Sequence, residues 1–181
     1  WTMLDFAQED VNQSLNEYFE VQGIPTVILI DHANGDKVIS TEARGAITNE
    51  PEGFPWKPKP VEILSEGNGS ILGNGPSVVV FVDSPAMAKD VQAKLTPAVD
   101  ALKRADPAAA EFTVAVSAPN RLADKLKEIA KTKDVAVMAF DLDDGQVAKS
   151  SLATAADVTP DALVAFVKGV TGGAVPWVPL Q

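Results

Sequence analysis

Cysteine and histidine, two side chains that often carry out catalysis, are scarce in this sequence. Its 181 residues include no cysteine and a single histidine, His32. Thiolate nucleophiles, disulfides and thiolate metal sites are therefore excluded for this stretch. One histidine cannot hold a zinc ion by itself, and His32 falls in a polar turn after a predicted strand, where we expect it to be solvated. The sequence predicts no metal site and no bound cofactor.

Ser84 is a hydroxyl that stands where a nucleophile is often found, between a predicted strand and a predicted helix. No histidine or other base accompanies it. The pair Ser84-Pro85 is typical of a helix N-cap followed by the first helical residue. We expect Ser84 to cap the helix rather than to react.

Two other clusters resemble ligand sites. Aspartates at two predicted turns suggest calcium: Asp31, Asp141, Asp143 and Asp144. The twelve-residue loop that ends in glutamate is absent, so we expect solvated turns. The glycine-rich stretch 67–75 has no following lysine and opens no helix, which favours a connector over a phosphate loop.

The composition limits the classes of partner. The net charge is -10, from 25 acidic and 15 basic residues, and a phosphate backbone would be repelled. No apolar run approaches the roughly 20 residues of a membrane helix. We therefore expect protein partners, no nucleic acid and no membrane insertion. The sequence leaves the oligomeric state open.

The stretch around which the chain is organised is Gly23-Ile24-Pro25-Thr26, because a continuous apolar run follows it. The run over residues 26–30 predicts a strand buried on both faces. A proline inside a central strand would remove a ladder hydrogen bond, so Pro25 begins the strand or shapes a special turn. Both isomers of the Ile24-Pro25 bond remain open on this pattern alone.

The rest of the chain alternates helices and strands. Apolar residues at spacing three to four predict helices over residues 9–19, 84–102, 122–129 and 160–170. Apolar runs predict strands over residues 61–64, 77–83, 112–117 and 135–140. The turns Asn34-Gly35 and Asp144-Gly145 predict hairpins with return strands at 37–40 and 146–149. Four prolines in residues 51–60 predict a stiff linker and a module boundary.

The two hairpins align without a gap at an offset of 110 residues, so that Asp31 matches Asp141 and Gly35 matches Gly145. The chain therefore carries two copies of one unit, the first without its front half. The complete copy reads strand, kinked helix, strand, helix, hairpin, helix. This order predicts an α/β fold of the thioredoxin-like type, a mixed sheet with helices on both faces, in one partial and one complete copy.

Several motifs carry a family resemblance. The Gly-Ile-Pro-Thr stretch resembles the cis-proline segment of thioredoxin-like proteins. The linker Phe54-Pro55-Trp56 with Pro58-Lys59-Pro60, together with the strand that follows Gly75-Pro76, resembles the junction between the catalytic and C-terminal domains of the nucleoredoxin family. The resemblance covers essentially the whole chain and is most specific in the linker.

This resemblance implies a thiol-disulfide oxidoreductase in which a low-pKa thiolate attacks a disulfide. By position, Ile24, Pro25 and Thr26 would form the substrate loop, with a cis Ile24-Pro25 bond. The nucleophile would lie before Trp1. The second copy departs twice from the family pattern, with Ser84-Pro85 at the redox junction and Val135 at the proline position. The resemblance also implies a cytoplasmic or nuclear location.

We expect three segments: residues 1–58 as the second half of a redox domain with its linker, residues 59–171 as a complete redox-inactive domain, and residues 172–181 as a tail. Trp177 in this tail is either disordered or a docking residue for a partner. Two hypotheses follow. The chain is the C-terminal part of a disulfide oxidoreductase and is inactive alone, or it is a non-catalytic binding or structural subunit.

Overall fold

The computed structural model describes residues 4–5, 7–21, 23–40, 43–44, 47, 51–56, 59–73, 75–132 and 134–180. Residues 49–50 and 57–58 of the predicted linker region lie outside these ranges. The chain divides into two compact units, Trp1–Pro58 (unit 1) and Lys59–Gln181 (unit 2). Each unit is described by itself.

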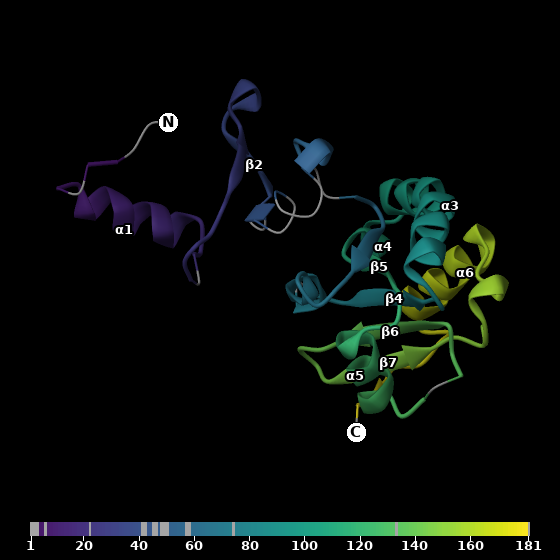
Figure 1. Ribbon diagram of the computed structural model, residues 1–181. Coiled ribbons are helices and arrows are strands. Elements are labelled where there is room, and N and C mark those ends of the chain that lie inside the picture. The colour runs from purple at the N-terminus through teal and green to yellow at the C-terminus, as the bar shows by residue number, and fades with distance from the viewer. Residues whose placement is uncertain are drawn as a thin grey trace. The chain divides into compact units, whose positions relative to one another are not determined.

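Unit 2 is built on one mixed sheet of six strands in the order β3-β5-β4-β6-β7-β8 (Figure 1). β5 lies parallel to β3 and β4, and every later neighbour is antiparallel. The strand bounds are Glu62–Leu64 (β3), Ser77–Phe81 (β4), Thr113–Ser117 (β5), Val137–Asp141 (β6), Gln146–Lys149 (β7) and Val178–Pro179 (β8).

The helices of unit 2 begin where their capping residues place them. α3 (Pro85–Ala105) begins after Ser84, α5 (Arg121–Ile129) after Asn120, and α6 (Pro160–Thr171) after Thr159. Each of these N-cap side chains accepts a hydrogen bond from a backbone N–H in the first turn. α3 continues through Pro97. The shorter helical segments are η3 (Gly69–Gly73), α4 (Pro107–Ala110) and η4 (Ala155–Asp157).

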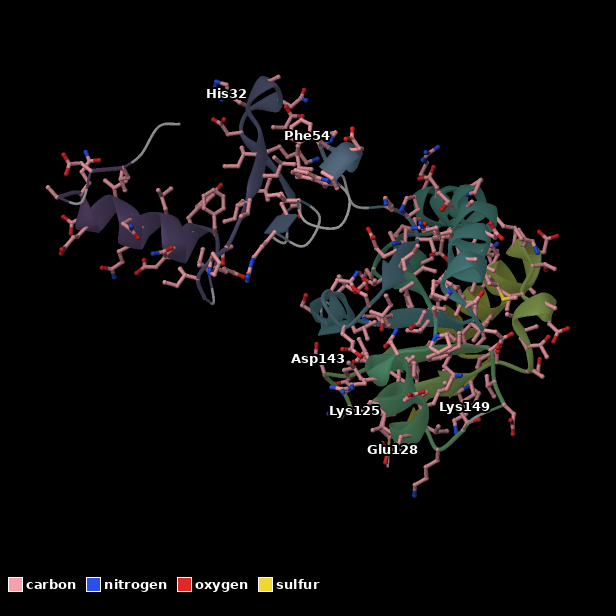
Figure 2. All side chains as sticks on the ribbon, in the orientation of Figure 1. His32, Phe54, Lys125, Glu128, Asp143 and Lys149 are labelled. Atoms are coloured by element: carbon pink, nitrogen blue, oxygen red, sulfur yellow. The ribbon has the colours of Figure 1, made fainter. Side chains whose placement is uncertain are left out.

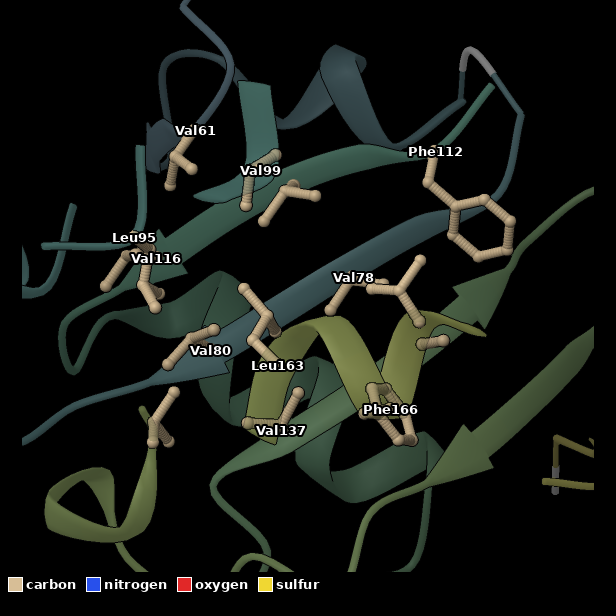
Figure 3. Packing of buried hydrophobic residues seen from close by; sticks show 14 of the residues in the cluster. Val61, Val78, Val80, Leu95, Val99, Phe112, Val116, Val137, Leu163 and Phe166 are labelled. Atoms are coloured by element: carbon tan, nitrogen blue, oxygen red, sulfur yellow. The ribbon is translucent and has the colours of Figure 1, made fainter. Parts of the chain in front are cut away.

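Alternate residues of the central strands supply the two sides of the core. Val78 and Val80 of β4 pack with α3 and α6, as Figure 3 shows, whereas Val79 and Phe81 pack with α5 and η3. Because side chains alternate across a strand, a run that is apolar at every position needs cover on both faces. The structure confirms the expected mixed sheet with helices on both faces.

The segment after α6 differs from the predicted tail. β8 adds to the edge of β7, with Val178 opposite Val147 and Pro179 opposite Gln146. Trp177 packs against the core of unit 2 and stacks on Phe112, with ring centroids 6.5 Å apart. The apolar side chains of Val175, Trp177 and Leu180 pack against the core of unit 2 and are partly removed from water, which favours this position of the segment. Residues 174–180 are therefore part of the domain.

The elements of unit 1 with described bounds are α1 (Glu9–Tyr18), the hairpin strands β1 (Leu29–Asp31) and β2 (Lys37–Ser40), and the 3-10 turns η1 (His32–Asn34) and η2 (Pro51–Gly53). Among its described residues only Ala43 is buried. The prediction of a strand buried on both faces is wrong for this chain, since Ile30 is 40% exposed. The physical reason is that, within the described part of unit 1, β1 pairs with β2 alone and no further strand extends this sheet.

The two hairpins match as far as their glycines and then diverge. Gly35 and Gly145 both have positive φ, at 75° and 63°. Asp36 adds one further left-handed residue in the first hairpin, at φ 60°. Asp31 therefore pairs with Lys37, whereas Asp141 pairs with Gln146.

Candidate functional site

The Gly-Ile-Pro-Thr segment forms an exposed loop, called here the 23–26 loop. The Ile24-Pro25 peptide bond is cis, as the resemblance implied, and Ile24 is 95% exposed. The Thr26 hydroxyl donates to the Gly23 carbonyl and closes the turn. The backbone N–H and C=O of Ile24 make no hydrogen bond with any residue that the structure describes. These two groups are available to pair with an extended chain.

In the corresponding segment of unit 2, the position that matches Thr26 is hydrogen-bonded within the domain. At the 110-residue offset Thr26 matches Ala136, whose N–H donates to the Leu152 carbonyl at 2.7 Å. Its carbonyl accepts from the Phe81 N–H, also at 2.7 Å. Because both backbone groups are used within the domain, this position offers nothing to an incoming peptide.

The strand–helix junction of unit 2 carries a cap and no thiol. Ser84 Oγ accepts a hydrogen bond from the Met87 N–H at 3.2 Å, so the predicted capping role is confirmed. The hydroxyl oxygen therefore points at the first turn of α3, where it satisfies an amide that would otherwise lack a partner.

The remaining candidate residues belong to turns. His32 lies at the turn of the β1–β2 hairpin (Figure 2), is exposed, and its Nδ1 lies 2.6 Å from Asp36 Oδ1. Asp141 accepts from the Asp144 N–H at 3.1 Å, and Asp31 accepts from the Asn34 side chain. Within the described ranges no three acidic or histidine side chains gather as a metal would require.

One cation of unit 2 has a shifted pKa. Burial of Lys103 in α3 lowers its pKa below the ordinary value of 10.5, and the attraction of Glu62 opposes the shift. Glu62 also accepts a hydrogen bond from the Lys59 N–H at 2.8 Å. We assign this cluster to the packing of α3 beside β3 rather than to chemistry.

Two features were missed by the sequence reasoning. The first is the stacking of Trp177 on Phe112, for which the sequence offered only an aromatic residue beside a predicted strand. The Phe54-Pro55 bond is also cis, and Phe54 meets Trp56 edge to face at 5.2 Å between ring centroids.

In the part of the chain that the structure describes, no helix is long and apolar enough to cross a membrane.

The strand order of unit 2, with two parallel neighbours followed by an antiparallel hairpin and helices on both faces, is that of thioredoxin-like domains. Unit 2 therefore has the thioredoxin-like fold that the sequence predicts.

Within this class the sequence is similar to nucleoredoxin. It is 30% identical to nucleoredoxin of Bos taurus over 174 residues, which cover 92% of this chain and 39% of that protein. The chain thus spans about two-fifths of the length of this relative and corresponds to a C-terminal portion. A tryparedoxin of Trypanosoma brucei brucei is 38% identical over 58 residues, 31% of this chain and 40% of that protein.

Among solved structures, the bb fragment of ERp72 aligns with a TM-score of 0.43 and 15% identity, covering 90% of this chain and 74% of that one. No protein-family model matches the chain.

Proposed function

We propose that this chain is the C-terminal part of a nucleoredoxin-like thiol-disulfide oxidoreductase. It contributes the substrate loop of the redox site, residues Ile24, Pro25 and Thr26, and a second domain without redox thiols. The observation that carries the proposal is that Ile24 is exposed and that its backbone has no hydrogen-bond partner among the described residues. The similarity to nucleoredoxin over 92% of the chain supports it.

The complete copy suggests what should cover unit 1. In unit 2 one side of β6 pairs with β4, and Val137 to Phe140 are fully buried. The equivalent residues 27–30 are half-buried or exposed. Helix α1 shows the same contrast, since its apolar Val11 and Leu15 are exposed, whereas Leu126 of α5 is buried. A preceding strand that pairs with β1 as β4 pairs with β6, together with the rest of its sheet, would bury both faces of β1.

The same comparison suggests where the thiols of a preceding segment would lie. In unit 2 the last residue of β4, Phe81, bonds to Ala136, and the strand–helix junction follows three residues later at Ser84. Because Ala136 is the equivalent of Thr26, a β4-type strand on β1 would bring its own junction to the 23–26 loop. A cysteine at the start of that helix would have a lowered pKa and would face Ile24.

The reaction then divides between the two halves. A thiolate of the preceding segment attacks one sulfur of the substrate disulfide and releases the other as a thiolate, and a second thiol resolves the mixed disulfide. An external dithiol must reduce the resulting disulfide for turnover. Ile24 holds the extended substrate through its N–H and C=O, which orients the scissile sulfur.

Kinetics of the longer gene product test the loop. Ile24→Pro removes the N–H and should lower kcat/KM for insulin disulfide reduction about tenfold, as expected for one hydrogen bond of about 1.4 kcal/mol. Ile24→Ala keeps the backbone and should retain most activity. The matched change Asp134→Pro in unit 2 should leave activity unchanged. Equal losses from Ile24→Pro and Asp134→Pro would contradict a specific role for the loop.

A second function is favoured for unit 2. Its loop equivalent is internally bonded at Ala136, and its junction carries Ser84 in place of a thiol. We propose that unit 2 acts as a non-catalytic domain that holds protein partners. The chain has 25 acidic and 15 basic residues, and this negative net charge favours a partner with a basic surface. Binding of a partner protein that persists after Ile24→Pro, but is lost when unit 2 is replaced by an unrelated domain, would support this role.

A further inference from the structure

The end of the chain returns across unit 2 as an extended segment, residues 175–180, called here the C-terminal strap. Gly172 and Gly173 follow α6, and Gly173 has a positive φ of 73°. The Val175 N–H then donates to the Gly169 carbonyl at 2.8 Å. A Cβ at position 169 would lie 2.8 Å from Val175 Cγ2, so the missing side chain allows the strap to approach α6.

The strap crosses the open edge of the sheet and contacts both sides of the core. Trp177 packs with the α3 and α6 side and stacks on Phe112 at an interplanar angle of 21°. Leu180 packs with the α5 side, and its N–H donates to the Gly145 carbonyl at 2.8 Å. Between these two anchors only Val178 and Pro179 pair with β7.

The strand beneath the strap has the properties of a docking edge. Val147 and Ala148 of β7 are buried, and without the strap their strand would end the sheet with a row of unpaired backbone groups. Pro179 has no N–H, so the strap itself is a poor template for another strand. The strap therefore covers an edge strand that could pair with another strand, and the new edge that it presents pairs poorly because of Pro179.

We propose that the C-terminal strap guards the β7 edge and that its release opens this edge to the β7 edge of a second copy. An antiparallel pairing centred between Val147 and Ala148 places Lys149 opposite Gln146, so no like charges face each other directly. Gly172 and Gly173 give the strap a hinge that leaves α6 intact. This inference is independent of the thiol chemistry proposed above.

Two variants release the strap by different means. Gly169→Leu places a side chain where Val175 lies, while leucine favours the helix over glycine by about 1 kcal/mol. A chain ending at Gly173 removes the strap altogether. Ala165→Leu, on the exposed face of α6, is the matched control. Circular dichroism reports whether each full-length variant keeps its helices and strands.

The absence of cysteine allows one label to report on the edge. Lys149→Cys places a spin label on an exposed position of β7, visible in Figure 2. In the proposed pairing the two Lys149 Cα atoms lie about 11 Å apart, which broadens the continuous-wave spectrum. Association through a surface remote from β7 leaves the two labels too far apart to broaden the spectrum.

We expect Gly169→Leu to strengthen self-association at least tenfold over the parent, with dipolar broadening, and Ala165→Leu to match the parent. Monomeric Gly169→Leu, or association without broadening, would overturn the proposal. Equal broadening in the parent or the control would also overturn it, because the strap would then not guard the edge. If the truncated chain fails to fold, Gly169→Leu decides the matter, since it retains every residue of the strap.

Discussion

The internal repeat makes a matched pair of substitutions informative. Ile30 and Phe140 occupy equivalent positions at the 110-residue offset, yet Ile30 is 40% exposed and Phe140 is fully buried. Phe140 lies in the cluster beneath α5, together with Val79 and Met138. If unit 1 lacks a core of its own and unit 2 is a complete domain, truncation at the two positions must have very different effects.

The magnitudes follow from burial. Phe140→Ala should cost about 3–5 kcal/mol of the free energy of unfolding of unit 2, from lost transfer energy and the cavity left behind. For a domain of 123 residues, 59–181, this lowers Tm by about 10–20 °C. Ile30→Ala should change the same transition by less than about 0.5 kcal/mol, because it lies in the other unit and has little cover to lose.

Thermal unfolding followed by circular dichroism measures both effects. In the longer gene product we expect Ile30→Ala to become costly, by about 2–5 kcal/mol, because the preceding segment then buries it. Equal destabilisation by Ile30→Ala and Phe140→Ala in the 181-residue chain would refute the claim that the described part of unit 1 has no core of its own. No added cost in the longer protein would refute the proposed cover.

Three further predictions concern unit 2. Ser84→Ala should cost about 1 kcal/mol, or about 4 °C in Tm, through the lost cap, and should leave disulfide reduction by the longer protein unchanged; a loss of activity at constant Tm would show that the hydroxyl reacts. Lys103→Met should raise stability at pH 7, where the half-buried ammonium of Lys103 is charged. The folded pKa of Lys103 lies below 10.5, so the gain should shrink as the pH rises through the folded pKa towards 10.5, and urea titrations at both ends of this range check the sign. Millimolar calcium should leave Tm unchanged, because the Asp141 carboxylate already holds the Asp144 N–H, and a calcium-dependent rise would contradict the solvated-turn interpretation.

Much of unit 2 could be predicted because its local signals agree with its tertiary environment. Ser84-Pro85 and Thr159-Pro160 begin helices at the predicted residues, and the fully apolar run beginning at Ser77 is covered on both faces. The strap could not be predicted. Gly172-Gly173 is typical of a chain that leaves the fold, and only tertiary contacts of Val175 and Trp177 bring it back.

Unit 1 shows the opposite limit. The run Val27–Ile30 carries the signal of a buried strand, but burial depends on residues that supply the cover, and β1 has β2 alone among the described residues of unit 1. The strand register of the first hairpin also differs from that of the second. The left-handed conformation of Asp36 lengthens the first turn by one residue, and the sequence gives no signal for it. Local patterns therefore predicted the elements better than their environment.

Disulfide reduction by the 181-residue chain alone tests the central claim most directly. Insulin is the substrate, dithiothreitol is the reductant, and the longer gene product is the positive control. We predict turnover by the longer protein and no rate above the dithiothreitol background for this chain, because the substrate loop is present and the thiols are not. Turnover by the chain alone would contradict the account, since the catalytic group would then lie among residues that we assign to binding and structure.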